Sequence, residues 1–284
     1  MKQVLAFACA LALCVGASAS DDGGYKSKVL DWRKAQETDL KKPDGWLAVA
    51  GLFWLSEGEN SVGTSDDCKV KLPARLSNKS IGPFVLSNGQ VTDPKHELEG
   101  LSAPGKPAVG FDTMTMDDVT LKVIKRGSRV GIRMIDPESK ARHDFKGMKW
   151  MPVNAKYCIQ AKFIPNDQPT ELQITNVLGD TNPVSSPGYV TFTIDGQECR
   201  LNAEPNGNGL FFNFADATSG KSTYPAGRFL YTDAPVNGMV TLDFNEAMNP
   251  PCAWTAYATC PLPPAGNRLT VAIKAGELVH HAEK

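Results

Sequence analysis

The segment YVTFTIDGQECRL, residues 189–201, carries the pattern that decides the fold class. Runs of hydrophobic and β-branched residues stand on both sides of Asp195-Gly196. Asp-Gly supplies the positive backbone dihedral angles that a two-residue hairpin turn requires, so it is suited to joining two antiparallel strands. The segment therefore predicts a β-hairpin.

The same signal recurs along the chain. Residues 84–86 and 90–91 flank Ser87-Asn88-Gly89, and residues 121–124 and 130–135 flank another short turn. Further strand-like runs occur at residues 46–55, 157–163, 171–176, 210–214, 229–231, 239–244 and 269–273. Many short strands joined by turns that contain Gly and Pro are typical of all-β proteins. We therefore expect an all-β fold, a mostly antiparallel sandwich or barrel.

One helix is expected before the strands. Val29, Trp32, Ala35 and Gln36 recur at helical spacing with charged residues between them, and Pro43 ends the pattern. This spacing predicts an N-terminal amphipathic helix that lies across the outside of the β fold.

The first residues resemble a signal peptide. One lysine precedes an apolar run from Val4 to Val15, and Ala17-Ser18-Ala19 provides a small-residue cleavage site. The run is shorter than the roughly 20 residues that span a bilayer, so an uncleaved anchor is the weaker alternative. We expect an exported protein, periplasmic or extracellular, without a membrane segment after cleavage. The expected organisation is a signal peptide at 1–19, a helical segment at 20–45, a single β-rich domain at 46–278 and a tail at 279–284.

Composition and motifs exclude several functions. The net charge is −1, with 30 basic and 31 acidic residues, which favours no nucleic-acid partner. The chain has no Gly-rich phosphate loop, HExxH, GxSxG or CxxC motif, so we expect no cofactor and no metal. With only four histidines, a catalytic triad is difficult to assemble, and His143 is expected at the surface.

The segment DFNEAMNPPCAWTAYATCPLPPAGNRLTVAIKAGE, residues 243–277, is too rich in proline for a regular helix or an inner strand. It predicts a long loop, with a strand only near its end. Long loops of rigid and hydrogen-bonding residues are common places for binding or catalysis.

Several motifs of the chain resemble a known family. TYPAGRFL begins at Thr223, NPPCA at Asn249 and CPLPP at Cys260, and AGE ends at Glu277. Together with GLFWLSEGEN, which begins at Gly51, they are similar to the domain of unknown function 1684 (DUF1684) of bacteria and archaea, over residues 46–277. The resemblance implies a single domain. The family has no established activity, so the resemblance assigns no catalytic residues.

Polar residues at the ends of predicted strands suggest a binding site. An arginine fork can hold a carboxylate or phosphate while an amide fixes the orientation of the ligand. The candidate ligand-binding residues are Arg133, Tyr224, Arg228, Asp243, Asn245 and Asn249. The alternative is structural: an internal pair between Arg228 and an acid, with Asn side chains capping backbone groups.

Carboxylates and cysteines in the same loop support further hypotheses. Asp243 or Glu246 with Glu277 would give the paired carboxylates of a hydrolase, with or without a metal. Cys252 and Cys260 are a disulfide candidate, and the alternative makes them metal thiolates.

Aromatic residues add a third kind of candidate. Trp54, Trp150, Trp254 and Tyr257 are candidates for a ring-stacking wall, although core packing is the commoner role of such residues.

The sequence thus favours an exported protein that binds a small polar or anionic ligand in a pocket around residues 243–277. A hydrolase and a structural or interaction module are the alternatives. Substitution of Asp243 by Ala would distinguish the three hypotheses. It should weaken ligand binding in the first case, abolish turnover in the second, and only destabilise the protein in the third.

Overall fold

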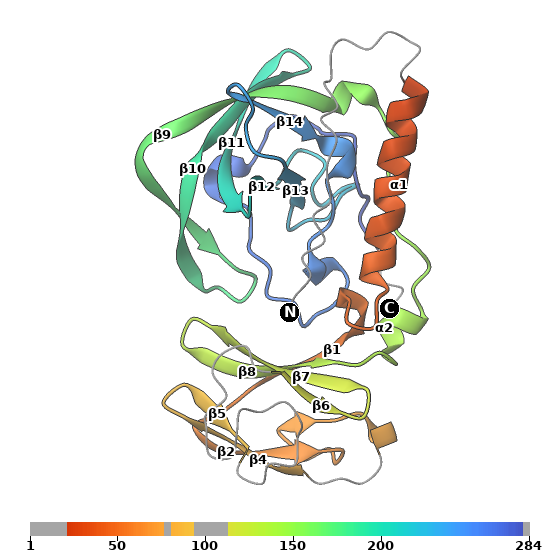
Figure 1. Cartoon of the computed structure of the whole chain (residues 1–284), viewed down its shortest axis with the longest axis vertical. Coiled ribbons are helices and arrows are strands. Elements are labelled where there is room, and N and C mark those ends of the chain that lie inside the picture. The colour runs from red at the N-terminus through yellow and green to blue at the C-terminus, as the bar shows by residue number, and fades with distance from the viewer. Residues whose placement is uncertain (1–21, 77–80, 94–112, 281–284) are drawn as a thin grey trace.

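The computed structural model describes residues 22–76, 81–93 and 113–280. The expected signal peptide at 1–19 lies outside these residues. Two β-rich lobes are stacked along the long axis of the molecule, and helix α1 (Asp22–Leu40) runs along one side of the larger lobe (Figure 1). The mostly antiparallel β fold with an N-terminal helix is confirmed.

The smaller lobe consists of two four-stranded sheets. One has the order β1 (Val49–Trp54), β8 (Arg129–Ile135), β7 (Val119–Arg126) and β6 (Thr113–Met116). The other has the order β3 (Val70–Lys71), β2 (Gly58–Gly63), β4 (Ile81–Ser87) and β5 (Gln90–Thr92). Both sheets contribute to one hydrophobic core, as buried residues such as Phe84, Leu121 and Ile132 show.

The larger lobe is a six-stranded antiparallel sheet that curls into a nearly closed barrel (Figure 1). Its order is β13 (Arg228–Thr232), β12 (Gly209–Phe214), β11 (Gln197–Asn206), β10 (Thr181–Ile194), β9 (Cys158–Thr175) and β14 (Met239–Asp243). The two edge strands of this sheet are β13 and β14. Beside them, Phe229 and Met248 exchange backbone hydrogen bonds of 2.8 and 3.0 Å. Phe212, Phe214 and Phe244 are fully buried in the core.

The hairpin predicted at residues 189–201 is present. Phe192 pairs with Cys199, and Ile194 pairs with Gln197. Asp195 and Gly196 have φ angles of 47° and 78°, which the Asp-Gly turn was expected to supply.

Four expected strands differ in the structure. The runs predicted at 157–163 and 171–176 are merged in one long strand, β9, and residues 46–48 form the 3-10 helix η1 before β1. Residues 269–273 are not a strand, although Val271 and Ile273 are buried. The carbonyl of Ile273 instead accepts a hydrogen bond of 3.1 Å from the Arg228 guanidinium. A side chain therefore satisfies a backbone group that a sheet ladder would otherwise pair.

The loop between residues 243 and 277 is irregular, as expected. After β14 it contains only short 3-10 helices among the described residues: η4 (Phe244–Glu246), η5 (Pro251–Ala253) and η6 (Ala265–Asn267). Two other 3-10 helices, η2 (Ala74–Leu76) and η3 (Ala155–Tyr157), lie elsewhere.

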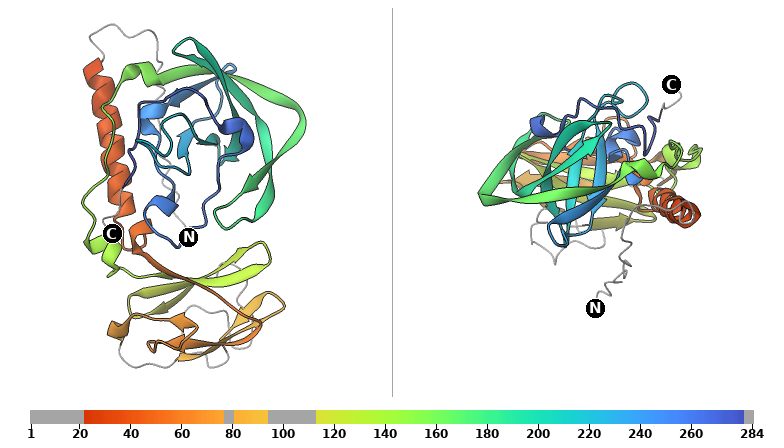
Figure 2. Two further views of the ribbon diagram at one scale, coloured as in Figure 1. Left: turned by 180° about the vertical axis from the view of Figure 1, so that it is seen from behind. Right: turned by 90° about the horizontal axis from the view of Figure 1, so that it is seen from above.

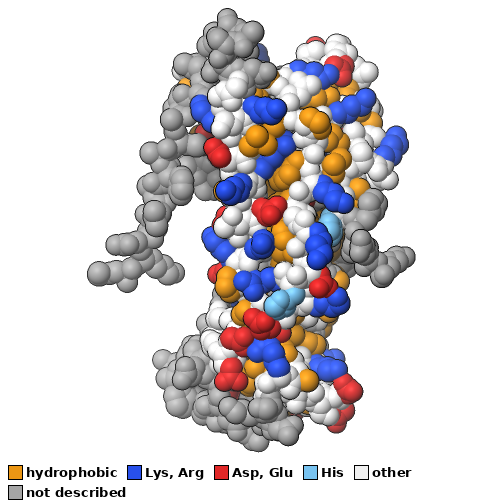
Figure 3. Space-filling model, turned by 90° about the vertical axis from the view of Figure 1, so that its right-hand side faces the viewer, with side chains coloured by type: hydrophobic (Ala, Val, Ile, Leu, Met, Phe, Trp, Pro, Cys, Tyr) orange, Lys and Arg blue, Asp and Glu red, His pale blue; other side chains and the backbone are white. Residues whose placement is uncertain are grey.

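Helix α1 packs against the outside of the barrel, as the view from above shows (Figure 2). It buries Val29, Arg33 and Leu40. The outer face shows basic and acidic side chains with hydrophobic ones between them (Figure 3). Among the described residues, no helix is long and apolar enough to cross a membrane.

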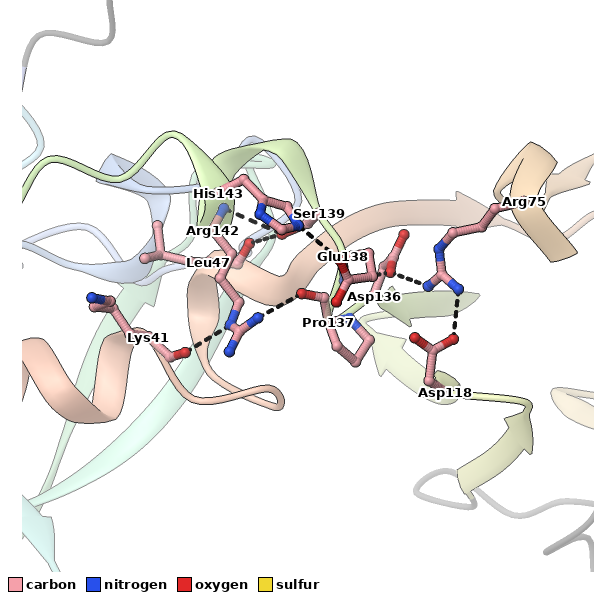
Figure 4. Close-up of polar contacts among 10 residues, drawn as sticks. All are labelled: Lys41, Leu47, Arg75, Asp118, Asp136, Pro137, Glu138, Ser139, Arg142 and His143. Atoms are coloured by element: carbon pink, nitrogen blue, oxygen red, sulfur yellow. Dashed lines mark hydrogen bonds and ion pairs between the residues drawn. The ribbon is translucent and has the colours of Figure 1, made fainter.

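A polar network near the short helix α2 (Lys140–His143) connects the smaller lobe to the segment that follows α1 (Figure 4). Arg75 of the smaller lobe binds both Asp118 and Asp136. Ser139 Oγ donates to the carbonyl of Leu47 at 2.6 Å, which fixes η1 beside the junction. His143 is exposed and lies 2.8 Å from Glu138, so the surface position expected for it is confirmed.

Candidate functional site

A cavity of about 450 Å³ lies where helix α1, strand β13 and the loop after β14 meet. It is bounded on a further side by Trp46 of η1. Its lining residues are Trp32, Gln36, Asp39, Leu40, Trp46, Met148, Phe229, Tyr231, Glu246, Met248, Asn249, Pro251 and Trp254. Five of the thirteen come from the loop that the sequence predicts to hold a site, so the cavity adjoins that loop.

Five of the thirteen lining residues are aromatic, and they come from α1, η1, β13 and the long loop. Trp32 projects from α1, Trp46 from η1, Phe229 and Tyr231 from β13, and Trp254 follows η5. Residues 229 and 231 face the same side because alternate side chains of a strand do so. The result is a site with large flat apolar surfaces.

Neighbouring rings hold these aromatic side chains in place. Trp254 contacts Phe145 edge to face, with ring centroids 5.6 Å apart, and packs against His280 at 4.7 Å. Trp32 is in edge contact with Trp150 at 5.9 Å. The fixed rings favour a preformed cavity.

Glu246 is the acidic side chain that the loop contributes to the cavity. It has no hydrogen-bond or ion-pair partner among the residues that the structure describes. Burial, and then the negative charge of Asp243, raises the pKa of Glu246 to about 7, and the positive charge of Arg33 opposes this rise. The carboxyl group is therefore divided between its neutral and ionised forms at neutral pH.

Asn249 belongs to the same wall, but its polar side-chain atoms are turned into the protein. Its Nδ2 donates to the carbonyl of Leu278 at 2.8 Å, whereas its buried Oδ1 has no hydrogen-bond partner in the described chain. Pro250 and Pro251 follow it and restrict the backbone, which fixes the position of Asn249.

Glu277 lies behind Asn249 and is completely buried. Its Oε2 accepts a hydrogen bond of 2.7 Å from the backbone N–H of Asn249. Burial raises the pKa of Glu277 to about 8, so the group is mostly protonated at neutral pH. Glu277 supports the cavity wall and is not among the residues that line it.

Arg228, a predicted ligand-binding residue, is instead internal. It is fully buried and donates to Asp216 at 2.6 Å and to the carbonyls of Ile273 and Ala275. The acid that pairs with Arg228 is Asp216, and Asp243 is not among its hydrogen-bond partners. The arrangement corresponds to the structural alternative, an internal pair of an arginine and an acid.

Asp243 and Asn245 form a second internal network with α1. Tyr25 donates to both oxygens of Asp243 at 2.9 and 2.8 Å. Asn245 donates to Asp243 at 2.9 Å and accepts from the backbone N–H of Asn154 at 2.9 Å. These contacts occupy the polar atoms that were expected to hold a ligand or act in catalysis.

Arg33 extends this network. Its guanidinium donates to the carbonyls of Asn245 and Met151, both at 2.9 Å, and stacks 4.7 Å above the ring of Trp150. Tyr25 and Arg33 were not predicted as site residues. The helical pattern could have indicated Arg33, because an arginine that faces inward among apolar positions needs buried hydrogen-bond acceptors.

Two further predicted residues contact neighbours of the cavity and do not line it. Arg133 is buried, with its guanidinium 5.2 Å from the ring of Trp46, which does line the cavity. Tyr224 donates to the carbonyl of Cys252 at 3.0 Å. Of the six predicted ligand-binding residues, Asn249 alone is among the lining residues.

Cys252 and Cys260 are neighbours, as a disulfide would require. Both are thiols in the structure, and the backbone N–H of Cys252 lies 3.2 Å from Cys260 Sγ. The predicted disulfide stays a prediction. No group of three or more metal-ligating side chains occurs among the described residues.

Of the four aromatic residues considered as a stacking wall, the structure brings Trp254 to the cavity. Trp54 lies in the smaller lobe under Arg129, at 4.9 Å, and Trp150 packs between Trp32 and Arg33. Tyr257 is exposed.

Comparison with known families identifies the larger lobe. Residues 143–278 match the family described as "Protein of unknown function (DUF1684)". The chain belongs to the DUF1684 family. The DUF1684 match starts after the smaller lobe and covers the barrel and its long loop, whereas α1 and the smaller lobe precede it.

One solved structure is similar to this DUF1684 protein. It is the solution NMR structure of an uncharacterised protein of Haloarcula marismortui, with 30% sequence identity and a TM-score of 0.41. The similarity covers 48% of this chain and 78% of the archaeal one. A search of curated proteins found no match.

Proposed function

We propose that this DUF1684 protein binds a small polar organic molecule in the aromatic cavity. The observation that carries the proposal is the combination of flat apolar walls with Glu246, a cavity-lining carboxylate that has no hydrogen-bond or ion-pair partner within the described chain. Polar groups that are largely removed from water are normally hydrogen-bonded, so a half-buried carboxylate without a protein partner suits a ligand that carries a donor. A cavity of this volume accommodates a small molecule.

The ligand-binding reading is better supported than a hydrolase. Asp243 is engaged by Tyr25 and Asn245, and Glu277 is enclosed behind Asn249. Glu246 would be a lone carboxylate in the cavity. The two separated carboxylates that hydrolysis was expected to use are thus committed to other contacts.

A thermal-shift screen of small organic molecules tests the proposal, because a ligand that binds only the folded state raises the melting temperature. Gln36→Phe places a ring in the cavity from the helix side, and we expect it to abolish the shift caused by any hit. Lys34→Phe is the matched control, because Lys34 is exposed on the same helix. Equal shifts in both variants would contradict the assignment of the site.

If no molecule in a chemically diverse screen stabilises the wild type, the binding proposal fails. The interaction-module alternative would then be favoured, with α1 and the loop acting as a structural support.

A further inference from the structure

The charge of the cavity wall is one-sided. Asp39 and Glu246 are acidic, and no Lys, Arg or His occurs among the described residues that line the cavity. Asp39 lies on an exposed turn of α1 and already pairs with Lys42 at 2.5 Å. Glu246 is therefore the acid available to a ligand.

The charged groups near Glu246 do not neutralise it by direct contact. Arg33 directs its hydrogen bonds to the carbonyls of Asn245 and Met151. Asp243 and Asp233 add negative charge nearby. An ionised carboxylate in a mostly apolar cavity is unfavourable when no counter-ion contacts it. A positively charged ligand would supply that counter-ion.

The walls also favour a cation. The electron-rich faces of Trp, Tyr and Phe attract positive charge, and Trp does so most strongly. Three tryptophans, Tyr231 and Phe229 line the cavity together with Glu246. Aromatic walls with an acid are the chemistry that recognises alkylammonium groups.

We propose that the ligand is an organic cation whose ammonium group lies between the Glu246 carboxylate and the tryptophan rings. This inference rests on the proposed function and specifies its ligand class. It replaces the expectation of an anionic ligand, which relied on Arg228, a residue that the structure commits to Asp216. An anion in this cavity would be repelled by Glu246.

Isothermal titration with three molecules of similar shape tests the charge requirement. The probes are choline, its uncharged analogue 3,3-dimethylbutan-1-ol, and the anion 3,3-dimethylbutanoate. We expect choline to bind at least about tenfold more tightly than the alcohol, and the anion to show no binding. Tighter binding of the alcohol or the anion would overturn the cation while leaving a ligand cavity in place.

Substitution of the acid tests the proposed contact. Glu246→Gln keeps the shape of the side chain and removes its charge, so we expect the preference for choline over the alcohol to disappear. Asp39→Asn is the matched control and should keep the preference, because Asp39 pairs with Lys42. An unchanged preference in Glu246→Gln would refute the role of this carboxylate.

The pH dependence provides an independent readout. Choline is permanently charged, and Glu246 has a pKa of about 7 beside Asp243, Asp233 and Arg33. Choline affinity should therefore rise between pH 6 and 8 in wild type and stay constant in Glu246→Gln. If all three probes and a diverse screen fail to bind, the cavity itself is refuted as a ligand site, which is distinct from failure of the cation alone.

Discussion

Arg228 and Asp216 form an ion pair in which both side chains are completely excluded from solvent, with 2.6 Å between Nη2 and Oδ2. The guanidinium also binds the carbonyls of Ile273 and Ala275, and Asp216 accepts hydrogen bonds from Thr218. The pair connects β13 to the segment after β12, and the carbonyl contacts of Arg228 add the end of the long loop.

Asp216→Ala should destabilise the protein by about 3–5 kcal/mol, because it leaves the buried Arg228 charge without a partner. Urea denaturation at neutral pH measures the change. Asp144→Ala removes an exposed pair with Lys140 and is the control, for which we expect no measurable change. Similar stabilities of wild type and Asp216→Ala would contradict the structural role of the pair.

The pH dependence of stability should reflect Glu277. Its pKa is raised from 4.5 to about 8 in the folded state, so the folded protein holds a proton that the unfolded chain releases between these values. The contribution to stability is fully present below pH 4.5 and is lost as pH rises toward 8. Glu277→Gln should weaken this loss.

Urea denaturation at pH 5, 6, 7 and 8 measures the effect on both proteins. Glu204 and Glu246, whose pKa values burial raises to about 7, remain in the variant and should leave a smaller loss of the same sign. Equal slopes for wild type and Glu277→Gln would show that Glu277 is not protonated in the folded protein.

Much of the fold could be predicted from local patterns. Asp195-Gly196 sets a hairpin through the dihedral angles of two adjacent residues, so the signal is contained in the sequence. Local patterns could not predict that two expected strands form the single strand β9. Its continuity depends on pairing with β10, which includes a shift in register after Ser186. Strand order is likewise set by contacts between distant residues.

The candidate site was predicted in part. The proline-rich loop was recognised, and Glu246 and Asn249 from it line the cavity. The opposite wall was missed, because the spacing of Trp32 and Gln36 predicts a helix but not what packs against it. The acidic partner of Arg228 was also missed. The sequence contains many acidic residues, and it does not indicate which of them the fold buries next to Arg228.

Cys252 should be the reactive thiol of the pair. A hydrogen bond from Cys260 lowers the pKa of Cys252 to about 7, against an opposing effect of burial. Alkylation of the reduced protein with iodoacetamide, followed by peptide mass spectrometry, should show modification of Cys252 that rises through pH 7. Cys199, whose pKa burial raises, is the internal control and should react slowly.

Cys260→Ala should move the alkylation midpoint of Cys252 to higher pH, because the hydrogen bond from the Cys260 thiol is lost. A midpoint near pH 9 in wild type would contradict the stabilised thiolate.

Oxidation should join Cys252 and Cys260, the pair that the sequence predicts as a disulfide. With glutathione disulfide as the oxidant, two exchange steps release two molecules of glutathione and leave one intramolecular disulfide, seen as a loss of two hydrogens in the intact mass. A short loop closed in this way should contribute about 2–3 kcal/mol to the free energy of unfolding. A mixed disulfide that persists on Cys252 would argue against the pair.

The most direct test of the cavity is a titration of choline into protein with ¹⁵N-labelled tryptophan indoles, followed by NMR. The chain has five tryptophans, of which Trp32, Trp46 and Trp254 line the cavity and Trp54 lies in the smaller lobe. We predict that the indole signals of the three lining residues shift together with one dissociation constant, while the Trp54 signal stays fixed. Shifts of Trp54 alone, or no shift of the three, would contradict the account.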